Sequence, residues 1–233
     1  MYSRKSSAGN IRFNNSCGNL GTIASLTFSQ KQALNLSWRL LKPQASACFR
    51  KIFLELEIAS PKVKQIFYKA ALVDAFNKDD DNSATMEVHI KLTTKFFDEL
   101  LVSLDDETEF VNKIRGIGSA HAILAKGSNF SSDIWERLGE IAMERVCSHE
   151  VVTTREASRA WRTLIAILID ELRGGFEGEL RQHRSQSQKR MMFMRRKSSS
   201  TDQIEMGKME DEEELHAKLQ QLRMDYNQTL PYT

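Results

Sequence analysis

The sequence has few of the residues that mark secreted, zinc-binding or membrane-spanning chains. Three cysteines and three prolines occur in 233 residues. Cys17, Cys48 and Cys147 lie far apart, without the CxxC spacing of a zinc site or the even number of a disulfide framework. The longest uninterrupted apolar run, residues 164–169, is too short to cross a bilayer. We therefore expect a reduced, cytoplasmic protein without a membrane span.

Motifs of the common enzyme classes are also missing. The chain has no glycine-rich phosphate loop, no nucleophile elbow and no HExxH pair. No pair of carboxylates stands out from ordinary solvated helix charges. The sequence therefore argues against a hydrolase or a nucleotide-dependent enzyme, and it leaves redox activity open.

Charge is distributed unevenly along the chain. Residues 1–54 contain no Asp or Glu, whereas residues 205–214 carry six acids against one lysine. Residues 1–28 are basic and serine-rich but contain few arginines, which favours a disordered N-terminal extension over a mitochondrial transit peptide. Residues 181–233 are predicted to form a charged C-terminal tail, with a short helix near residues 215–222.

Apolar residues recur with helical spacing from Ser29 to about Leu180, and no segment shows the alternation of a strand. The chain is therefore predicted to be all-α, with one folded domain over residues 29–180. The stripes of the two central helices consist of Met86, His89, Ile90, Thr93, Phe97, Leu100, Leu101 and Leu104, and of Phe110, Ile114, Ile117, His121 and Leu124.

Capping residues predict where the first helices begin and end. Ser29 with Gln32 is typical of a capping box at the start of the first helix. Further along, residues 63–68 predict only a short turn. The polar residues 77–82 predict a loop before the helix that carries His89.

The last helix of the folded domain has its own start and stop signals. Thr153 with Glu156 predicts a capping box at its beginning. The pair Gly174 and Gly175 predicts its end, because glycine is common just after a helix.

Two histidines occupy stripe positions of separate predicted helices. His89 and His121 lie 32 residues apart, and no other histidine falls in a predicted core stripe. A single histidine on an apolar helix face is more often a core residue bonded to a nearby carbonyl. Two of them in an all-helical chain can instead lie on opposite faces of one iron porphyrin. The pair therefore predicts haem b as cofactor, with His121 and His89 as candidate iron ligands.

Four motifs give this sequence a resemblance to the globin family, most closely to its neuroglobin-type branch, over roughly residues 29–180. They are Ser37-Trp38-Arg39, Pro61 followed six residues later by Phe67, Ile117-Gly118-Ser119-Ala120-His121, and Ala160-Trp161 leading into Arg173-Gly174-Gly175-Phe176-Glu177-Gly178-Glu179. The resemblance implies a globin fold around a haem pocket, with disordered tails.

The resemblance also implies roles for individual residues. His121 would be the proximal ligand and His89 the distal histidine. The other implied haem-binding positions are Phe53, Phe67, Thr93, Ile117 and Leu124. Globins usually carry Val or Ile where this chain has Thr93, whose hydroxyl either enters the distal pocket or, the favoured interpretation, bonds the carbonyl one turn back.

As a globin, the protein would bind dioxygen or another diatomic gas. A distal histidine such as His89 either donates to the bound gas or binds the iron itself, and the sequence leaves both states open. The second state favours redox signalling or electron transfer with an unidentified reductase or signalling partner. Two other classes stay open: a haem-free globin-like interaction or sensor module, and a cytochrome-like or peroxidase-like redox enzyme.

The segment from Arg181 to Lys197 holds seven Arg and Lys residues and no acid, with four apolar residues at 191–194. A solvated tail is the plainer interpretation. The alternatives are contact with an anionic membrane surface or with a calmodulin-like partner. Ser198 follows Arg-Arg-Lys and resembles a basophilic kinase site. No specific nucleic-acid partner is expected, because the chain has no recognition module.

Overall fold

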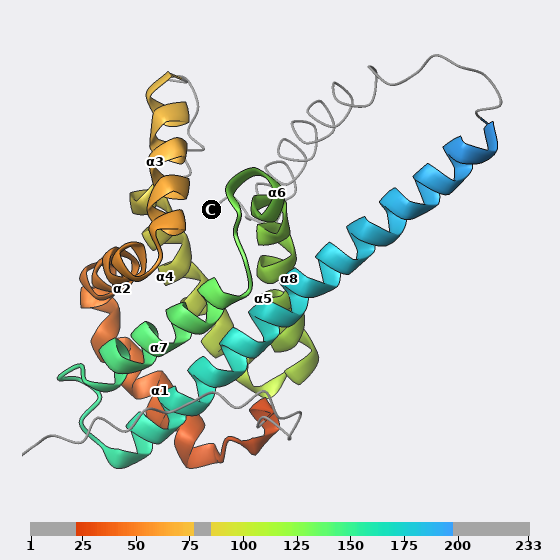
Figure 1. The fold of residues 1–233 in the computed structure, drawn as a ribbon. Coiled ribbons are helices and arrows are strands. Elements are labelled where there is room, and N and C mark those ends of the chain that lie inside the picture. The colour runs from red at the N-terminus through yellow and green to blue at the C-terminus, as the bar shows by residue number, and fades with distance from the viewer. Residues whose placement is uncertain (1–21, 77–84, 198–233) are drawn as a thin grey trace, which may run out of the picture.

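The computed structural model describes residues 22–76 and 85–197, which contain helices and connecting turns but no strand (Figure 1). The all-α prediction is therefore confirmed for this part of the chain. The α-helices are α1 (Phe28–Leu41), α2 (Ala45–Ala59), α3 (Pro61–Phe76), α4 (Met86–Val102), α5 (Glu107–Ala120), α6 (Leu124–Ser128), α7 (Asp133–Cys147) and α8 (Arg155–Lys197). Short 3-10 turns cover Ile23–Ser25, Lys42–Gln44, Ser103–Asp105 and His121–Ile123.

The N-terminal end of the folded body lies earlier than the sequence predicts. Ile23 and Leu26 are 3 % and 5 % exposed and belong to the core. The predicted disorder of residues 1–28 is therefore wrong for residues 22–28, because these two apolar side chains cover the core. Residues 1–21 lie outside the described part of the chain.

The N-cap of helix α1, Thr27, lies two residues before the predicted cap, Ser29. The Thr27 hydroxyl accepts from the Gln30 backbone N–H at 3.2 Å, and the Gln30 side chain accepts from the Thr27 N–H at 2.9 Å. This reciprocal pair is a capping box, so the motif was predicted correctly and its position, Ser29 with Gln32, was wrong.

Helix α3 is longer than the turn predicted for residues 63–68. Pro61 stands at its first position, where the missing N–H costs no helical hydrogen bond. The helix continues to Phe76. The polar loop predicted for residues 77–82 lies outside the described residues.

Helix α8 passes straight through Gly174 and Gly175, so the predicted end of the helix is wrong. A Cβ atom at Gly175 would overlap the carbonyl oxygen of Arg115 on α5, and one at Gly118 of α5 would overlap the carbonyl oxygen of Leu172. These glycines allow two helix backbones to touch, rather than ending a helix. The predicted cap was also one residue early, because Thr154, and not Thr153, accepts from the Ala157 N–H at 3.1 Å.

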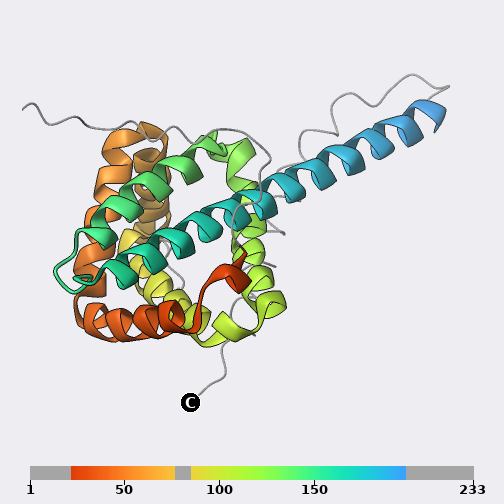
Figure 2. The ribbon, with the colours of Figure 1, turned by 90° about the horizontal axis from the view of Figure 1, so that it is seen from below.

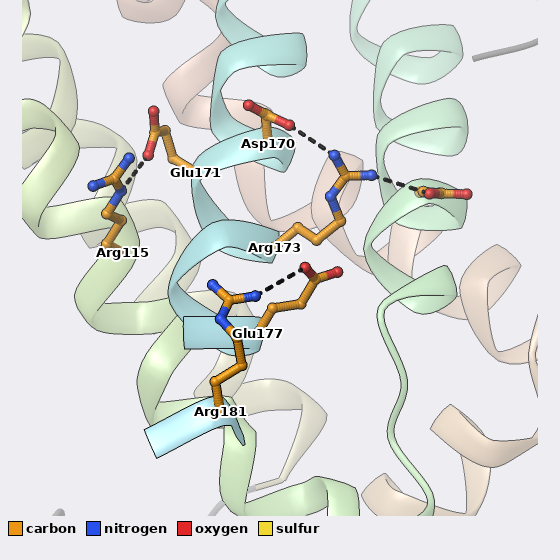
Figure 3. Close-up of polar contacts among 7 residues, drawn as sticks. Arg115, Asp170, Glu171, Arg173, Glu177 and Arg181 are labelled. Atoms are coloured by element: carbon orange, nitrogen blue, oxygen red, sulfur yellow. Dashed lines mark hydrogen bonds and ion pairs between the residues drawn. The ribbon is translucent and has the colours of Figure 1, made fainter. Parts of the chain in front are cut away.

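Ion pairs add to the attachment of α8 (Figure 3). Arg115 of α5 pairs with Glu171 at 2.5 Å. Arg173 pairs with Asp170 at 3.0 Å on its own helix and with Glu136 of α7 at 3.3 Å. Exposed pairs of this kind contribute at most about 1 kcal/mol each. The close backbone crossing therefore positions α8, and the ion pairs reinforce it.

Aromatic residues of α1, α2, α4 and α8 fill one part of the core. The ring of Trp38 lies 5.5 Å from Phe97 and 6.4 Å from Trp161, measured between centroids. The buried indole N–H of Trp161 donates to the Ser37 hydroxyl at 2.8 Å, and that of Trp38 donates to Asp98 at 2.8 Å. Both indoles are therefore satisfied; the Trp38 bond links α1 to α4, the helix that carries His89, and the Trp161 bond links α8 to α1.

Candidate functional site

The side chains of the two predicted histidines lie close together inside the helical body. His89 comes from the first turn of α4, and His121 from the 3-10 turn directly after α5. Their ring centroids lie 6.1 Å apart, with 68° between the ring planes. The structure thus brings together two imidazoles that are separated by 32 residues of sequence.

The orientation of His121 is fixed by its own helix. Its Nδ1 lies 2.8 Å from the carbonyl oxygen of Ile117, one turn earlier. A carbonyl can only accept, so Nδ1 carries the hydrogen and donates it. The other ring nitrogen, Nε2, then keeps its lone pair, which is the arrangement that a metal-binding histidine requires.

Burial keeps both imidazoles neutral near pH 7. Burial, and to a smaller extent the charge of His121, lowers the pKa of His89 from 6.5 to about 4. Burial also lowers the pKa of His121, partly opposed by the hydrogen bond to Ile117. Each residue as a whole is nevertheless only partly buried. Both histidines can therefore offer a nitrogen lone pair to a ligand lying between them.

Two phenylalanines, both assigned to the haem pocket by the resemblance, lie beside His89. The centroid of the Phe53 ring lies 5.0 Å from that of His89, and the Phe67 centroid lies 5.6 Å from it. The two phenyl rings are 6.1 Å apart. The His89 side of the site is therefore an apolar wall built from α2, α3 and α4.

Aromatic residues that the sequence did not assign to the site surround His121. The Trp135 ring lies 5.2 Å and the Phe130 ring 6.0 Å from the His121 ring. Phe176 of α8 packs on Phe130 at 5.5 Å. Trp135 has helical spacing with Leu138 and Ala142 of α7, and this spacing was the signal available in the sequence. Its indole N–H is buried and has no hydrogen-bond partner among the described residues.

The remaining predicted site residues have different positions. The Thr93 hydroxyl donates to the backbone carbonyl of His89 at 2.8 Å, which is the favoured of the two geometries expected for it. Ile117 contributes its carbonyl to His121, and its side chain is partly buried against the core. Leu124, the first residue of α6, is likewise partly buried against the core.

The residues present fit a haem better than a free metal ion. The ring centroids of His89 and His121 lie 6.1 Å apart, so the two imidazoles are close enough for one iron between them to take a nitrogen from each. Within the described ranges, no group of three or more His, Cys, Asp or Glu side chains could hold a metal ion. Two nitrogens suit an iron whose other four ligands belong to a porphyrin.

Comparison with known proteins gives matches to globins. The family model described as Globin matches residues 50–172. The chain is 94 % identical over 217 residues to "Globin-like protein 9" of Caenorhabditis elegans, covering 93 % of this chain and 82 % of that one. It is 90 % identical to the protein of the same name in Caenorhabditis briggsae, covering 93 % and 84 %.

A solved structure has the same fold. It is described as a "hexacoordinated heme protein from anhydrobiotic tardigrade", has a TM-score of 0.51 and 17 % identity, and is matched over 66 % of this chain and 96 % of its own. None of these matches separates the neuroglobin-type branch from other globins, so that finer likeness stays a prediction. The helical body, the facing histidines and the family match lead to one conclusion: this chain belongs to the globin family.

Proposed function

We propose that this protein binds haem b, with the iron held between His121 and His89. The observation that carries the proposal is the pair of neutral, facing imidazoles 6.1 Å apart, with the Nδ1 hydrogen of His121 bound to a carbonyl. The name of the tardigrade protein, whose fold this chain shares, describes six-coordinate iron, which is in line with two histidine ligands.

Bound haem supplies an iron that changes oxidation state and accepts diatomic ligands. The residues of this chain decide which ligand occupies the position on the His89 side. His121 would hold the haem on its side, because its ring orientation is fixed by the hydrogen bond to Ile117. The His89 ring would compete with an incoming gas, and the apparent gas affinity would be multiplied by the fraction of molecules in which the position is open.

The His89 ring would also be the hydrogen-bond donor for a gas held on its side of a haem. The neighbouring side chains of Phe53 and Phe67 are apolar, and the Thr93 hydroxyl already donates to a backbone carbonyl. This arrangement suits a gas sensor, or an electron carrier served by a reductase, better than bulk oxygen storage. In electron transfer the two imidazoles stay in place, so little rearrangement accompanies the change of oxidation state.

Haem titration and absorption spectroscopy test the proposal. The full chain is expected to take up one haem and to give low-spin spectra in the ferric and dithionite-reduced forms, and carbon monoxide is expected to displace the low-spin ferrous bands. A five-coordinate, high-spin ferrous spectrum would assign His89 to gas binding alone. Absence of stoichiometric uptake would contradict the proposal and favour the haem-free interaction module.

A further inference from the structure

Helix α8 continues well beyond the globin body. Its last core residue is Phe176, and Leu180 packs at the edge of the core. From Arg181 onward the helix projects away from the other helices, in Figure 1 and in the view turned by 90° (Figure 2). Residues 181–197 of this helix extend for about 25 Å at 1.5 Å per residue.

The projecting part of α8 has positive charge and no negative charge of its own. Residues 180–197 contain seven Arg and Lys and no Asp or Glu. The acids nearest to it already have partners, since Glu177 pairs with Arg181 at 3.7 Å (Figure 3) and Glu179 contacts His183 at 3.2 Å. Arg184 and Lys189 are exposed and have no acid three or four residues away on the helix. This surface therefore attracts a polyanion.

Apolar residues lie only at the outer end of the projection. Met191 and Met192 are 72 % and 69 % exposed, and Phe193 and Met194 follow them in the sequence. Residues 182–190 contain no apolar side chain. A helix that docks in a protein groove carries an apolar stripe at positions i, i+3, i+4 and i+7, and the projecting part of α8 has no such stripe.

We propose that the C-terminal part of α8, residues 181–197, docks on the surface of a bilayer that contains anionic phospholipids. A short apolar cluster enters the boundary between head groups and acyl chains, while the flanking basic residues interact with the lipid phosphates and carboxylates. None of the described helices has the length and hydropathy to span a membrane. The contact is therefore at the interface, and it leaves the globin body in water.

Sedimentation with vesicles of phosphatidylcholine, with or without phosphatidylserine, tests this proposal on the full chain. Binding is expected only to the vesicles that contain phosphatidylserine, and it is expected to weaken as salt rises. At about 1 kcal/mol per basic residue, Arg184→Gln with Lys189→Gln lowers the partition coefficient roughly thirty-fold. The separate double variant Met191→Ser with Met192→Ser is expected to lower the partition coefficient below that of the charge variant, at any salt concentration.

A matched control removes the same charge from the globin body. Lys51 and Arg159 are exposed, and Lys51→Gln with Arg159→Gln is expected to leave binding unchanged. If both charge variants lost the same amount of vesicle binding, the vesicles would attract the charge of the whole protein and not that of α8. If the protein bound equally well to vesicles without phosphatidylserine, it would adsorb without recognising charge. Either result overturns the proposal.

The acidic segment 205–214 of the same chain is the alternative partner that would compete with lipids for the basic part of α8. Its charge is reduced by Asp211→Asn, Glu212→Gln and Glu213→Gln in the full chain. Vesicle binding by the unaltered chain supports the proposal. Binding that occurs only in the triple variant would overturn it, because the acidic segment would then occupy the helix in the native chain.

Discussion

The two histidines of the site differ in how the surrounding structure fixes their imidazole rings. His121 follows α5, whose backbone touches that of α8 at Gly118 and Gly175, and its ring donates to the Ile117 carbonyl. His89 lies in the first turn of α4, and no hydrogen bond to its ring nitrogens occurs among the described residues. One imidazole is therefore held by a hydrogen bond and the other is not, so, on the proposed function, an incoming ligand is expected to displace His89 rather than His121.

The largest effect is expected on the rigid side. His121→Ala removes the ligand whose orientation is fixed, and loss of one outer hydrogen-bond partner of a ligand already costs 10–100-fold in metal affinity as a rule. Haem transfer to apomyoglobin is therefore expected to accelerate by more than about a hundredfold. His149→Ala, in the turn after α7, serves as control. An unchanged transfer rate and spectrum in His121→Ala would assign the iron to another ligand.

Neighbouring glycines of α8 test the helix crossing that supports His121. A methyl group at Gly175 meets the Arg115 carbonyl, whereas one at Gly174 has no atom within 4 Å. Gly175→Ala is expected to destabilise the protein by about 2–3 kcal/mol, and Gly174→Ala to stabilise it by up to about 1 kcal/mol. Urea unfolding of the haem-free chains measures both. Similar effects of the two substitutions would contradict the close crossing.

Acid is expected to lower the free energy of unfolding of the haem-free protein, because His89 and His121 are buried and neutral in the folded state. Unfolded histidine binds a proton below about pH 6.5, but burial holds the pKa of folded His89 at about 4. The free energy of unfolding therefore falls as pH drops from 6.5 to 4, by roughly 3 kcal/mol for His89 alone. The lowered pKa of His121 acts in the same direction.

A comparison of variants measures this contribution. His89→Gln is expected to flatten the fall in unfolding free energy between pH 6.5 and 4, and His149→Gln is expected to leave it unchanged. If His89→Gln retained the full fall, the buried, neutral state of His89 would be refuted.

The smallest effect is expected at Thr93. Its hydroxyl donates to the His89 carbonyl and is not available to a ligand, so Thr93→Val removes one local hydrogen bond, worth about 1 kcal/mol or less. Carbon monoxide and dioxygen affinities are expected to change less than threefold. A selective loss of dioxygen affinity would place the hydroxyl beside the bound gas instead.

Periodicity predicted most of the helices, because apolar stripes record which face each helix buries. Sequence prediction failed where the same residue type occurs in two different structural settings. Gly174 and Gly175 have the sequence of a helix end, but Gly175 instead permits contact with Arg115 of a helix far away in the chain. Ile23 and Leu26 gave no periodic signal, since two apolar residues outside a helix are ordered only by the core they cover.

The histidine pair was predicted from the sequence because each histidine stands in an apolar stripe, and the resemblance supplied Phe53 and Phe67. Trp135 and Phe130 were missed as site residues. A buried aromatic residue has the same sequence spacing whether it packs against other core residues or against a histidine of the site. Only the three-dimensional structure shows that Phe130 and Trp135 contact His121.

Rapid mixing of the reduced haem protein with carbon monoxide tests the difference between the two histidines most directly. The binding rate of the unaltered chain is expected to reach a plateau as carbon monoxide increases, because His89 must first leave the iron. The rate in His89→Leu is expected to rise in proportion to carbon monoxide over the same range. Proportional rates with equal slopes in both proteins would contradict the account, since His89 would then not be a ligand.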